Sequence, residues 1–510
     1  MNIKMKLKKL KIVFFALAFS IFAQSIAVVG EELKIGDPIG LYKNVYDANY
    51  AGEIEKQETT EAKDTHKITP FEEVVSSENG GVVTNQKNVY LGNGDFYWFR
   101  RYIFKETLPN GGRFNAGITI PGNTIEIRYV DPVTKQWVLT SDLNKLKNVK
   151  TTLYINTDTN SAILSVPAVY RNLFTNSTLE VLREDEHPIA ITHDNGVYTI
   201  SFSFPKDSSK IGEIWCLQSQ NKLVDWTNQN NYNYLRVHDL SLERRWSWDG
   251  YYFKTPANYN PSGENILYKH SANYTGASFA RYGECQLAID LGYVMTSTCL
   301  KNQNEEGFWP TGPSSEWLLS DFDIGTYFYD TRFSTDFAIN LIFAYKRYEY
   351  QPFLDGAKKY AEYFLKHAQN NHYEFGDGWL IEDYSANSKQ EAHKRTHVSL
   401  NHQVNEMNFL YYLYNETQDT RYYDLADKML KGIDNTKYKW VLSDGNLNYA
   451  LMYNGTYNTM VDYPYLTYND LFELRQILTS YGIQNVTINY LMETKKAYMD
   501  SHGITEYRKQ

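Results

Sequence analysis

Tyrosines in polar loops are the residues of this chain whose type and spacing could do chemistry. Residues 440–471 read WVLSDGNLNYALMYNGTYNTMVDYPYLTYNDL, and six tyrosines fall between Tyr449 and Tyr468. Upstream, residues 376–384 read GDGWLIEDY, and residues 396–413 read THVSLNHQVNEMNFLYYL. The Asp, Asn, Gly and Thr residues around these tyrosines are typical of loops. Since loops held by helices often carry functional groups, we expect a site here.

Three tyrosines stand out, although most of the 44 tyrosines in the chain are expected to be structural. Tyr384 follows Glu382 by two positions, and Tyr449 and Tyr463 lie in the second loop. A tyrosine has a free pKa of about 10. To act as a base it needs a cation or a hydrogen-bond donor beside the phenolate. The candidates in the sequence are Arg332, His397, His402 and Arg421.

Several other polar residues could have either a functional role or a purely structural one. Arg332, in the run FYDTRFSTD, could bind a carboxylate or pair with Asp330 or Asp336. His397 and His402 are five residues apart and do not share a helix face closely, so a metal site at this pair is not expected. His397 could bind substrate or cap the helix start. Two asparagines could bind sugar or cap turns: Asn401 and Asn469.

Composition excludes several classes of protein. The net charge of −9 argues against a nucleic-acid partner. The P-loop, GxGxxG and GxSxG motifs of nucleotide chemistry and serine hydrolysis do not occur in a fitting context.

The three cysteines are widely spaced, which argues against a zinc site. They are expected to be buried thiols, with one disulfide as the alternative. No cofactor is expected. Asp321 and Asp323 leave structural calcium open, although two carboxylates are fewer than calcium requires.

The N-terminal segments predict an exported protein. Residues 1–30 have a lysine-rich start, an apolar centre and small residues at 25–27, as in a signal peptide, with an uncleaved membrane anchor as the alternative. Secretion or a cell-surface location is therefore expected. Residues 31–87 have few large apolar residues and predict a linker or arm, part of which could form an edge hairpin.

Two patterns follow along the chain. Residues 88–265 contain short alternating runs separated by Asn-Gly turns, which predict an antiparallel β-sandwich or barrel. Residues 266–510 have helical apolar spacing, with helix pairs at 333–367, 398–433 and 469–499. The first two pairs repeat at an offset of 65–66 residues. The sequence thus predicts an α+β multidomain chain whose C-terminal domain is a toroid-like (α/α) barrel with a cleft where the loops converge.

The C-terminal half resembles the catalytic domain of D-glucuronyl C5-epimerases, which convert glucuronate to iduronate in heparosan-type chains. The resemblance covers roughly residues 307–478 and rests on GFWP, WLIEDY, SLNH, DGNLNYAL and DYPYLTYNDL. It implies that Tyr384, Tyr449 and Tyr463 are the catalytic tyrosines and Glu382 their acidic neighbour. It also implies a β-domain joined to an (α/α) barrel. The chain departs from the family at Ala450, where the family has Asp.

The predicted activity is therefore C5 epimerisation of glucuronate in a heparosan-like polysaccharide, an isomerase reaction without a cofactor. Tyr449 and Tyr463 are expected to be the opposed acid and base, with Tyr384 and Glu382 as supporting groups. Two alternatives remain: a polysaccharide lyase acting on uronates by β-elimination, and a non-catalytic glycan-binding protein. A homodimer is compatible with the sequence. The expected substrate-binding residues are Arg332, His397, Asn401 and Asn469.

Overall fold

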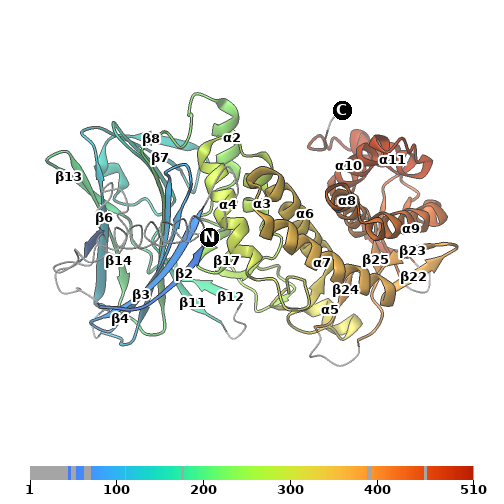
Figure 1. Cartoon of the computed structure of the whole chain (residues 1–510), viewed down its shortest axis with the longest axis horizontal. Coiled ribbons are helices and arrows are strands. Elements are labelled where there is room, and N and C mark those ends of the chain that lie inside the picture. The colour runs from blue at the N-terminus through green and yellow to red at the C-terminus, as the bar shows by residue number, and fades with distance from the viewer. Residues whose placement is uncertain are drawn as a thin grey trace, which may run out of the picture.

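The computed structural model describes residues 44–46, 53–61, 70–108, 111–173, 177–387, 393–452 and 457–508. Antiparallel sheet makes up the N-terminal part and helices make up most of the C-terminal part (Figure 1). The predicted signal peptide or anchor, residues 1–30, lies outside the described residues. In the described part of the chain, no helix is both long and apolar enough to span a bilayer.

Two sheets form the N-terminal part. The smaller sheet has the strand order β1 (Asn44–Tyr46), β6 (Arg113–Pro121), β14 (Val197–Pro205) and β13 (Ala190–Asp194). The larger sheet has the order β16 (Arg244–Ser247), β17 (Gly250–Lys254), β19 (Ile266–Lys269), β12 (Thr178–Val181), β11 (Ala168–Asn172), β15 (Ile211–Ser219), β10 (Ser161–Leu164), β9 (Leu153–Thr157), β7 (Ile125–Val130) and β8 (Trp137–Thr140). From β15 it branches through β5 (Phe96–Phe104), β4 (Val82–Tyr90), β3 (Phe71–Asn79) and β2 (Glu53–Glu61).

The larger sheet is buried on both faces along β5 and β15. Phe96 and Trp98 point into the core between the two sheets, whereas Tyr97 and Phe99 point into the core shared with the helices. Successive side chains of a strand face opposite sides. A strand covered on both faces therefore reads as the continuous apolar run FYWF rather than as an alternating one. The sheet is the wall on which the helical part rests.

Strands begin earlier in the chain than the predicted β-domain does. In the arm expected at 31–87, residues 53–61, 71–79 and 82–90 pair as consecutive antiparallel strands. The edge-hairpin alternative therefore describes this part of the arm better than a linker does, because β4 pairs along its whole length with β5. Residues 225–263, within the predicted β-domain, contain α2 (Gln229–Val237) and the sheet strands β16 and β17.

Four antiparallel helix pairs follow the sheets. Asp330 caps the start of α6 by accepting a hydrogen bond from the Phe333 N–H at 2.9 Å. Between the first pair and α6 lies the short helix α5 (Glu316–Phe322). The pairs are α3 (Tyr274–Tyr282) with α4 (Gln286–Leu300), α6 (Thr331–Tyr348) with α7 (Gln351–Asn370), α8 (Leu400–Thr417) with α9 (Thr420–Thr436), and α10 (Leu466–Ser480) with α11 (Val486–Ser501).

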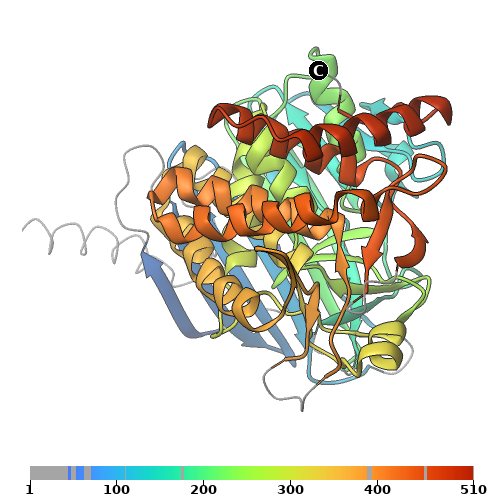
Figure 2. The same ribbon diagram turned by 90° about the vertical axis from the view of Figure 1, so that its right-hand side faces the viewer.

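The first helix of each pair forms an inner row. In this row α3 packs on α6, α6 on α8, and α8 on α10. Figure 2 shows the later pairs, orange to red, side by side. An ion pair of 2.6 Å joins Arg281 of α3, at one end of the row, to Glu473 of α10, at the other end. This arc of hairpins agrees with a helical C-terminal domain, and closure into an (α/α) toroid stays a prediction.

Short strands at one end of the helices tie the loops together. β21 (Tyr329–Asp330) pairs with β24 (Tyr384–Ser385), and β22 (His372–Phe375) pairs with β23 (Gly378–Ile381). β26 (Asn448–Leu451) lies between β25 (Val398–Ser399) and β27 (Tyr457–Val461), and β18 (Tyr259–Asn260) pairs with β20 (Ser314–Ser315). The cysteines are buried free thiols, as expected: Cys216, Cys285 and Cys299.

Candidate active site

A cleft of about 1030 Å³ opens at the loop end of the inner helices. Its walls come from α3, α5, α6, α8 and α10 and from the short strands β18, β24 and β26. Aromatic rings and carboxyl groups both line it. Seven of the eight residues predicted for the site lie on its surface: Arg332, Tyr384, His397, Asn401, Tyr449, Tyr463 and Asn469.

Strand pairing brings the predicted residues together from distant segments. Tyr384 of β24 is the direct pairing partner of Asp330 of β21, and directly opposite residues of antiparallel strands have neighbouring side chains. Ser399 of β25 pairs with Ala450 of β26, so His397 lies near Tyr449. Tyr463 follows two residues after β27, which pairs with β26. Three segments separated by tens of residues thus meet in one cleft.

The tyrosines and histidines form a continuous series of rings. The His397 ring centroid lies 5.7 Å from that of Tyr384 and 5.8 Å from that of Tyr449. The Tyr449 and Tyr463 centroids are 5.8 Å apart at an angle of 75°. Two rings in edge-to-face contact leave no room for a sugar between them. The expectation that Tyr449 and Tyr463 oppose each other across the substrate is therefore wrong for this arrangement.

Burial keeps these phenols protonated. It raises the pKa of Tyr384 and Tyr449 well above the usual value, and nearby Asp330 and Asp383 raise both further. The pKa of Tyr463 is also raised, first by burial and then by Asp330, although its side chain is partly exposed. The sequence analysis required a cation beside a phenolate base. The structure places carboxylates near all three phenols, and Arg332, which lowers the pKa of Tyr463, does not bring that pKa back to its usual value. Phenols that stay protonated can act as proton donors.

Glu382 lies outside the cleft. Its side chain is buried, its Oε1 pairs with Arg395 Nε at 2.7 Å, and its Oε2 accepts the Thr396 N–H at 2.8 Å. These bonds fix the turn that leads into α8. The adjacent residue, Asp383, faces the histidines instead, because consecutive residues of an extended segment point in opposite directions. Glu382 therefore has a structural place, and Asp383 is the acidic neighbour of the site.

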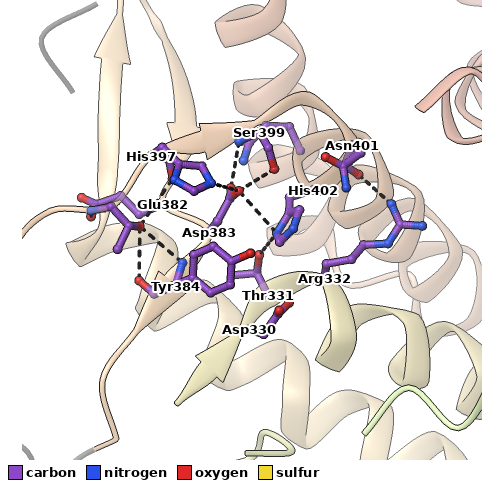
Figure 3. Close-up of polar contacts among 12 residues, drawn as sticks. Asp330, Thr331, Arg332, Glu382, Asp383, Tyr384, His397, Ser399, Asn401 and His402 are labelled. Atoms are coloured by element: carbon purple, nitrogen blue, oxygen red, sulfur yellow. Dashed lines mark hydrogen bonds and ion pairs between the residues drawn. The ribbon is translucent and has the colours of Figure 1, made fainter. Parts of the chain in front are cut away.

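Asp383 organises the histidines of the site (Figure 3). Its Oδ2 lies 3.3 Å from His397 Nε2 and 3.7 Å from His402 Nδ1, and the Ser399 hydroxyl and N–H donate to the same carboxylate. His402 Nδ1 also bonds the Thr331 hydroxyl at 2.8 Å. Burial lowers the pKa of His402 to about 4, so its imidazole is neutral at pH 7 and one of its two ring nitrogens carries a free lone pair.

Arg332 is bound to carboxylates of the protein itself. Its guanidinium donates to Asp336 at 3.1 Å, to Asp470 at 2.6 Å and to the main-chain oxygen of Asn401 at 3.0 Å. Arg281 and Arg508 on the cleft wall are likewise paired with Glu473, each at 2.6 Å. Every arginine on the described cleft surface thus has an acidic partner, which weakens the expected role of Arg332 in binding a substrate carboxylate.

The two predicted asparagines differ in their bonding. Asn401 lines the cleft, and among the described residues its buried Oδ1 has no hydrogen-bond partner. Asn469 Oδ1 accepts the Arg508 N–H at 2.8 Å and holds the C-terminal segment. The calcium alternative depended on Asp321 and Asp323. Asp321 lines the cleft, whereas the carboxylate of Asp323 is paired with Lys394 at 3.1 Å, so the two carboxylates have different neighbours.

Asp330 is a site residue that the sequence analysis did not select. It is 3% exposed, lines the cleft beside Tyr384, and appears in the sequence only as an alternative partner for Arg332. Its pKa is raised to about 8, first by burial and then by Asp383 and Asp336, while the hydrogen bonds from the N–H groups of Phe333 and Arg332 lower it. The sequence signal at this position is an Asp-Thr pair at a helix start. This pair is typical of an ordinary N-cap and does not by itself indicate a functional carboxylate.

The chain matches no protein-family model. It likewise matches no curated protein sequence. Among solved structures it is similar to a D-mannose isomerase (14% identity, 47% of this chain and 63% of that one, TM-score 0.35). It is also similar to a family 76 glycoside hydrolase from a bovine Bacteroides thetaiotaomicron strain (10% identity, 79% and 75%, TM-score 0.37) and to an unsaturated glucuronyl hydrolase specific for heparin (13%, 46% and 60%, TM-score 0.31). The chain spans less than two thirds of the isomerase and of the glucuronyl hydrolase.

Proposed function

We propose that the protein is a carbohydrate epimerase that inverts C5 of glucuronate residues in a heparosan-like polysaccharide. The observation that carries this proposal is the convergence of Tyr384, Tyr449 and Tyr463, selected from separate sequence motifs, on one cleft. The ring-lined walls, including Trp317 and Tyr259, suit the flat faces of pyranose sugars. The motif resemblance to D-glucuronyl C5-epimerases supplies the reaction.

The proposed roles follow from which side chains carry a proton at pH 7: the His402 imidazole is neutral and the Tyr449 and Tyr463 phenols are protonated. The neutral imidazole of His402 takes the proton from C5, and the electron pair of the broken C–H bond moves into the C6 carboxyl group. A phenol of the Tyr449–Tyr463 pair then donates its proton to C5 from the other face, which gives iduronate. The histidinium and the phenolate return to their starting states by proton transfer through solvent. Asp383 stabilises the charged histidine, as a carboxylate beside an imidazolium does.

Uronate β-elimination is a second candidate, favoured by one observation. Tyr449 and Tyr463 are in ring contact and do not face each other across a sugar. Elimination begins with the same removal of the C5 proton, but the proton donor then acts on the leaving oxygen at C4. It requires no donor on the opposite face. The reaction breaks the chain and leaves an unsaturated uronate.

Proton NMR of heparosan incubated with the protein in D2O tests the proposal. Epimerisation predicts deuterium at C5 together with iduronate signals, and elimination predicts unsaturated-uronate signals and shorter chains. Tyr449→Phe and Tyr463→Phe then test the donor role, because each variant retains the ring and loses only the hydroxyl. Unchanged spectra with heparosan under conditions in which the protein is folded would contradict both reactions and favour a non-catalytic glycan-binding role.

A further inference from the structure

The proposed reaction needs a group that neutralises the substrate carboxylate. Removal of the C5 proton places negative charge on the C6 carboxyl group, which is already anionic. Enzymes stabilise such developing charge with preorganised donors or cations. The arginines on the described cleft surface cannot do this freely, because Arg281, Arg332 and Arg508 are each paired with an acidic side chain.

Asp330 is placed where such a donor is needed. Its carboxyl group lies at the first turn of α6, in the cleft and opposite Tyr384 across the β21–β24 pair. One oxygen, Oδ1, accepts the Phe333 N–H, and this bond holds the side chain in position. The Asp330 side chain is almost fully buried, so bulk water does not stabilise its anionic form.

We propose that Asp330 in its acid form hydrogen-bonds to the C6 carboxylate of the bound uronate and shares its proton with it while C5 loses its own. This inference rests on the proposed function. The O–H proton moves toward the substrate oxygen as charge develops there and returns to Asp330 when C5 is reprotonated, so no other reactant is consumed. Short bonds between a carboxylic acid and a carboxylate are among the stronger hydrogen bonds in proteins.

The surroundings of Asp330 favour the acid form in the free protein. The guanidinium of Arg332, two residues away, is directed to Asp336 and Asp470 and not to Asp330. Burial first, then Asp383 and Asp336, hold the Asp330 pKa near 8. The titratable and charged groups that face Asp330 are Asp383 and Tyr384 of the β24 segment, Arg332 and Asp336 of α6, Glu406 of α8, Tyr259 of β18, Tyr268 of β19, Tyr274 of α3, Tyr360 of α7, Tyr449 of β26, and Tyr463 before α10.

A pair of matched ligands tests the proposal by binding. The probes are a heparosan oligosaccharide and the same oligosaccharide with its glucuronates reduced to glucose, titrated calorimetrically between about pH 6 and pH 9.5. The wild type is expected to lose affinity for the uronate ligand by about tenfold per pH unit once Asp330 ionises, as linkage to one proton requires. The reduced ligand lacks the carboxylate and is expected to bind with a weak pH dependence.

Asp330→Asn provides the matched variant. Asn also caps helices, so the fold is expected to persist, and the amide still donates a hydrogen bond but cannot ionise or transfer a proton. The steep alkaline loss of uronate affinity should disappear in this variant, and C5 exchange in D2O should fall by about 100-fold or more. Asp355→Asn, on the exposed side of the outer helix α7, should leave both pH profiles as in the wild type.

The outcomes separate this inference from the proposed function. Uronate binding whose pH dependence is the same in wild type and Asp330→Asn would overturn the role of Asp330 while leaving the epimerase proposal standing. Activity that rises with pH through the same range would also overturn it, because Asp330 would then act as a base. Absence of both binding and C5 exchange at every pH would count against the proposed function itself and remove this role with it.

Discussion

Lys495 Nζ of α11 lies 2.7 Å from Asp462 Oδ2, and both side chains are buried. The same ammonium group donates to the main-chain oxygen of Tyr463 at 2.8 Å and to Asn446 Oδ1 at 2.7 Å. One side chain of the outer helix thus fixes the two loops that carry Tyr449 and Tyr463. The position of the tyrosine pair therefore depends on a charge that lies outside the cleft.

Replacing this lysine should destabilise the protein and displace the tyrosine pair. Lys495→Met leaves Asp462 buried without its cation, and loss of one partner of a buried pair costs about 3–5 kcal/mol. Urea unfolding followed by circular dichroism measures this change. Lys496→Ala, which removes an exposed partner of Asp500 one residue further on, is the control and should change stability little. Equal effects of both substitutions would contradict the buried-pair argument.

Removing single hydroxyls from the tyrosine pair should reduce catalysis without unfolding the protein. Tyr449→Phe and Tyr463→Phe retain the ring contact, so we expect near-native melting temperatures. If one of these phenols is the proton donor, its loss should slow C5 exchange by about 100- to 10,000-fold. Tyr465→Phe, in the same loop but not on the cleft surface, is the control. Full activity in both single variants would refute the donor role.

The two adjacent acids before Tyr384 should respond differently to neutralisation. Glu382→Gln weakens the bonds to Arg395 and the Thr396 N–H, and we expect a loss of about 1–3 kcal/mol in stability with the pH profile of activity preserved. Asp383→Asn removes the negative charge beside His397 and His402. It should mainly lower kcat and shift the pH profile of kcat/KM. If Glu382→Gln lowered kcat and shifted the pH profile while Asp383→Asn mainly lost stability, Glu382 would be the acidic neighbour of the tyrosines, as the sequence predicts.

Asp330 should make the stability of the protein depend on pH. A carboxyl whose pKa is about 8 in the folded state and 3.8 in the unfolded state binds its proton more tightly when folded. The free energy of unfolding therefore falls as pH rises from about 4 to about 8. Asp330→Asn cannot ionise and should lack this contribution. Since Asp470, with a pKa raised to about 6, is common to both proteins, the difference between wild type and variant isolates Asp330.

Denaturant unfolding at about pH 5 and pH 8.5 measures that contribution. The variant should gain stability relative to the wild type at the higher pH. A difference between the two proteins that is the same at both pH values would mean that Asp330 keeps an ordinary pKa in the folded state. This measurement needs no substrate, so it tests the ionisation of Asp330 independently of the proposed reaction.

Local patterns were enough to predict the sheet and helix classes. The apolar repeat over 333–367 and 398–433 corresponds to α6–α7 and α8–α9, because helical spacing is a property of neighbouring residues. Local patterns predict the strands of the arm before residue 88 less well. Its strands carry few large apolar residues, and they form because β4 finds β5 as a partner. The stability of a paired strand comes from cross-strand contacts, and a short stretch of sequence does not contain the partner residues.

The sequence by itself determined that Tyr384, Tyr449 and Tyr463 are candidates for one site, because loop composition marks their segments and the resemblance to D-glucuronyl C5-epimerases implies these three. Only the tertiary structure decided their chemistry. The pairing of Asp330 with Tyr384, the contact of Tyr449 with Tyr463, and the turn of Glu382 away from the cleft all depend on strands that meet across large sequence separations. Proton affinity follows burial and neighbouring charge, and both are set by which segments meet in space.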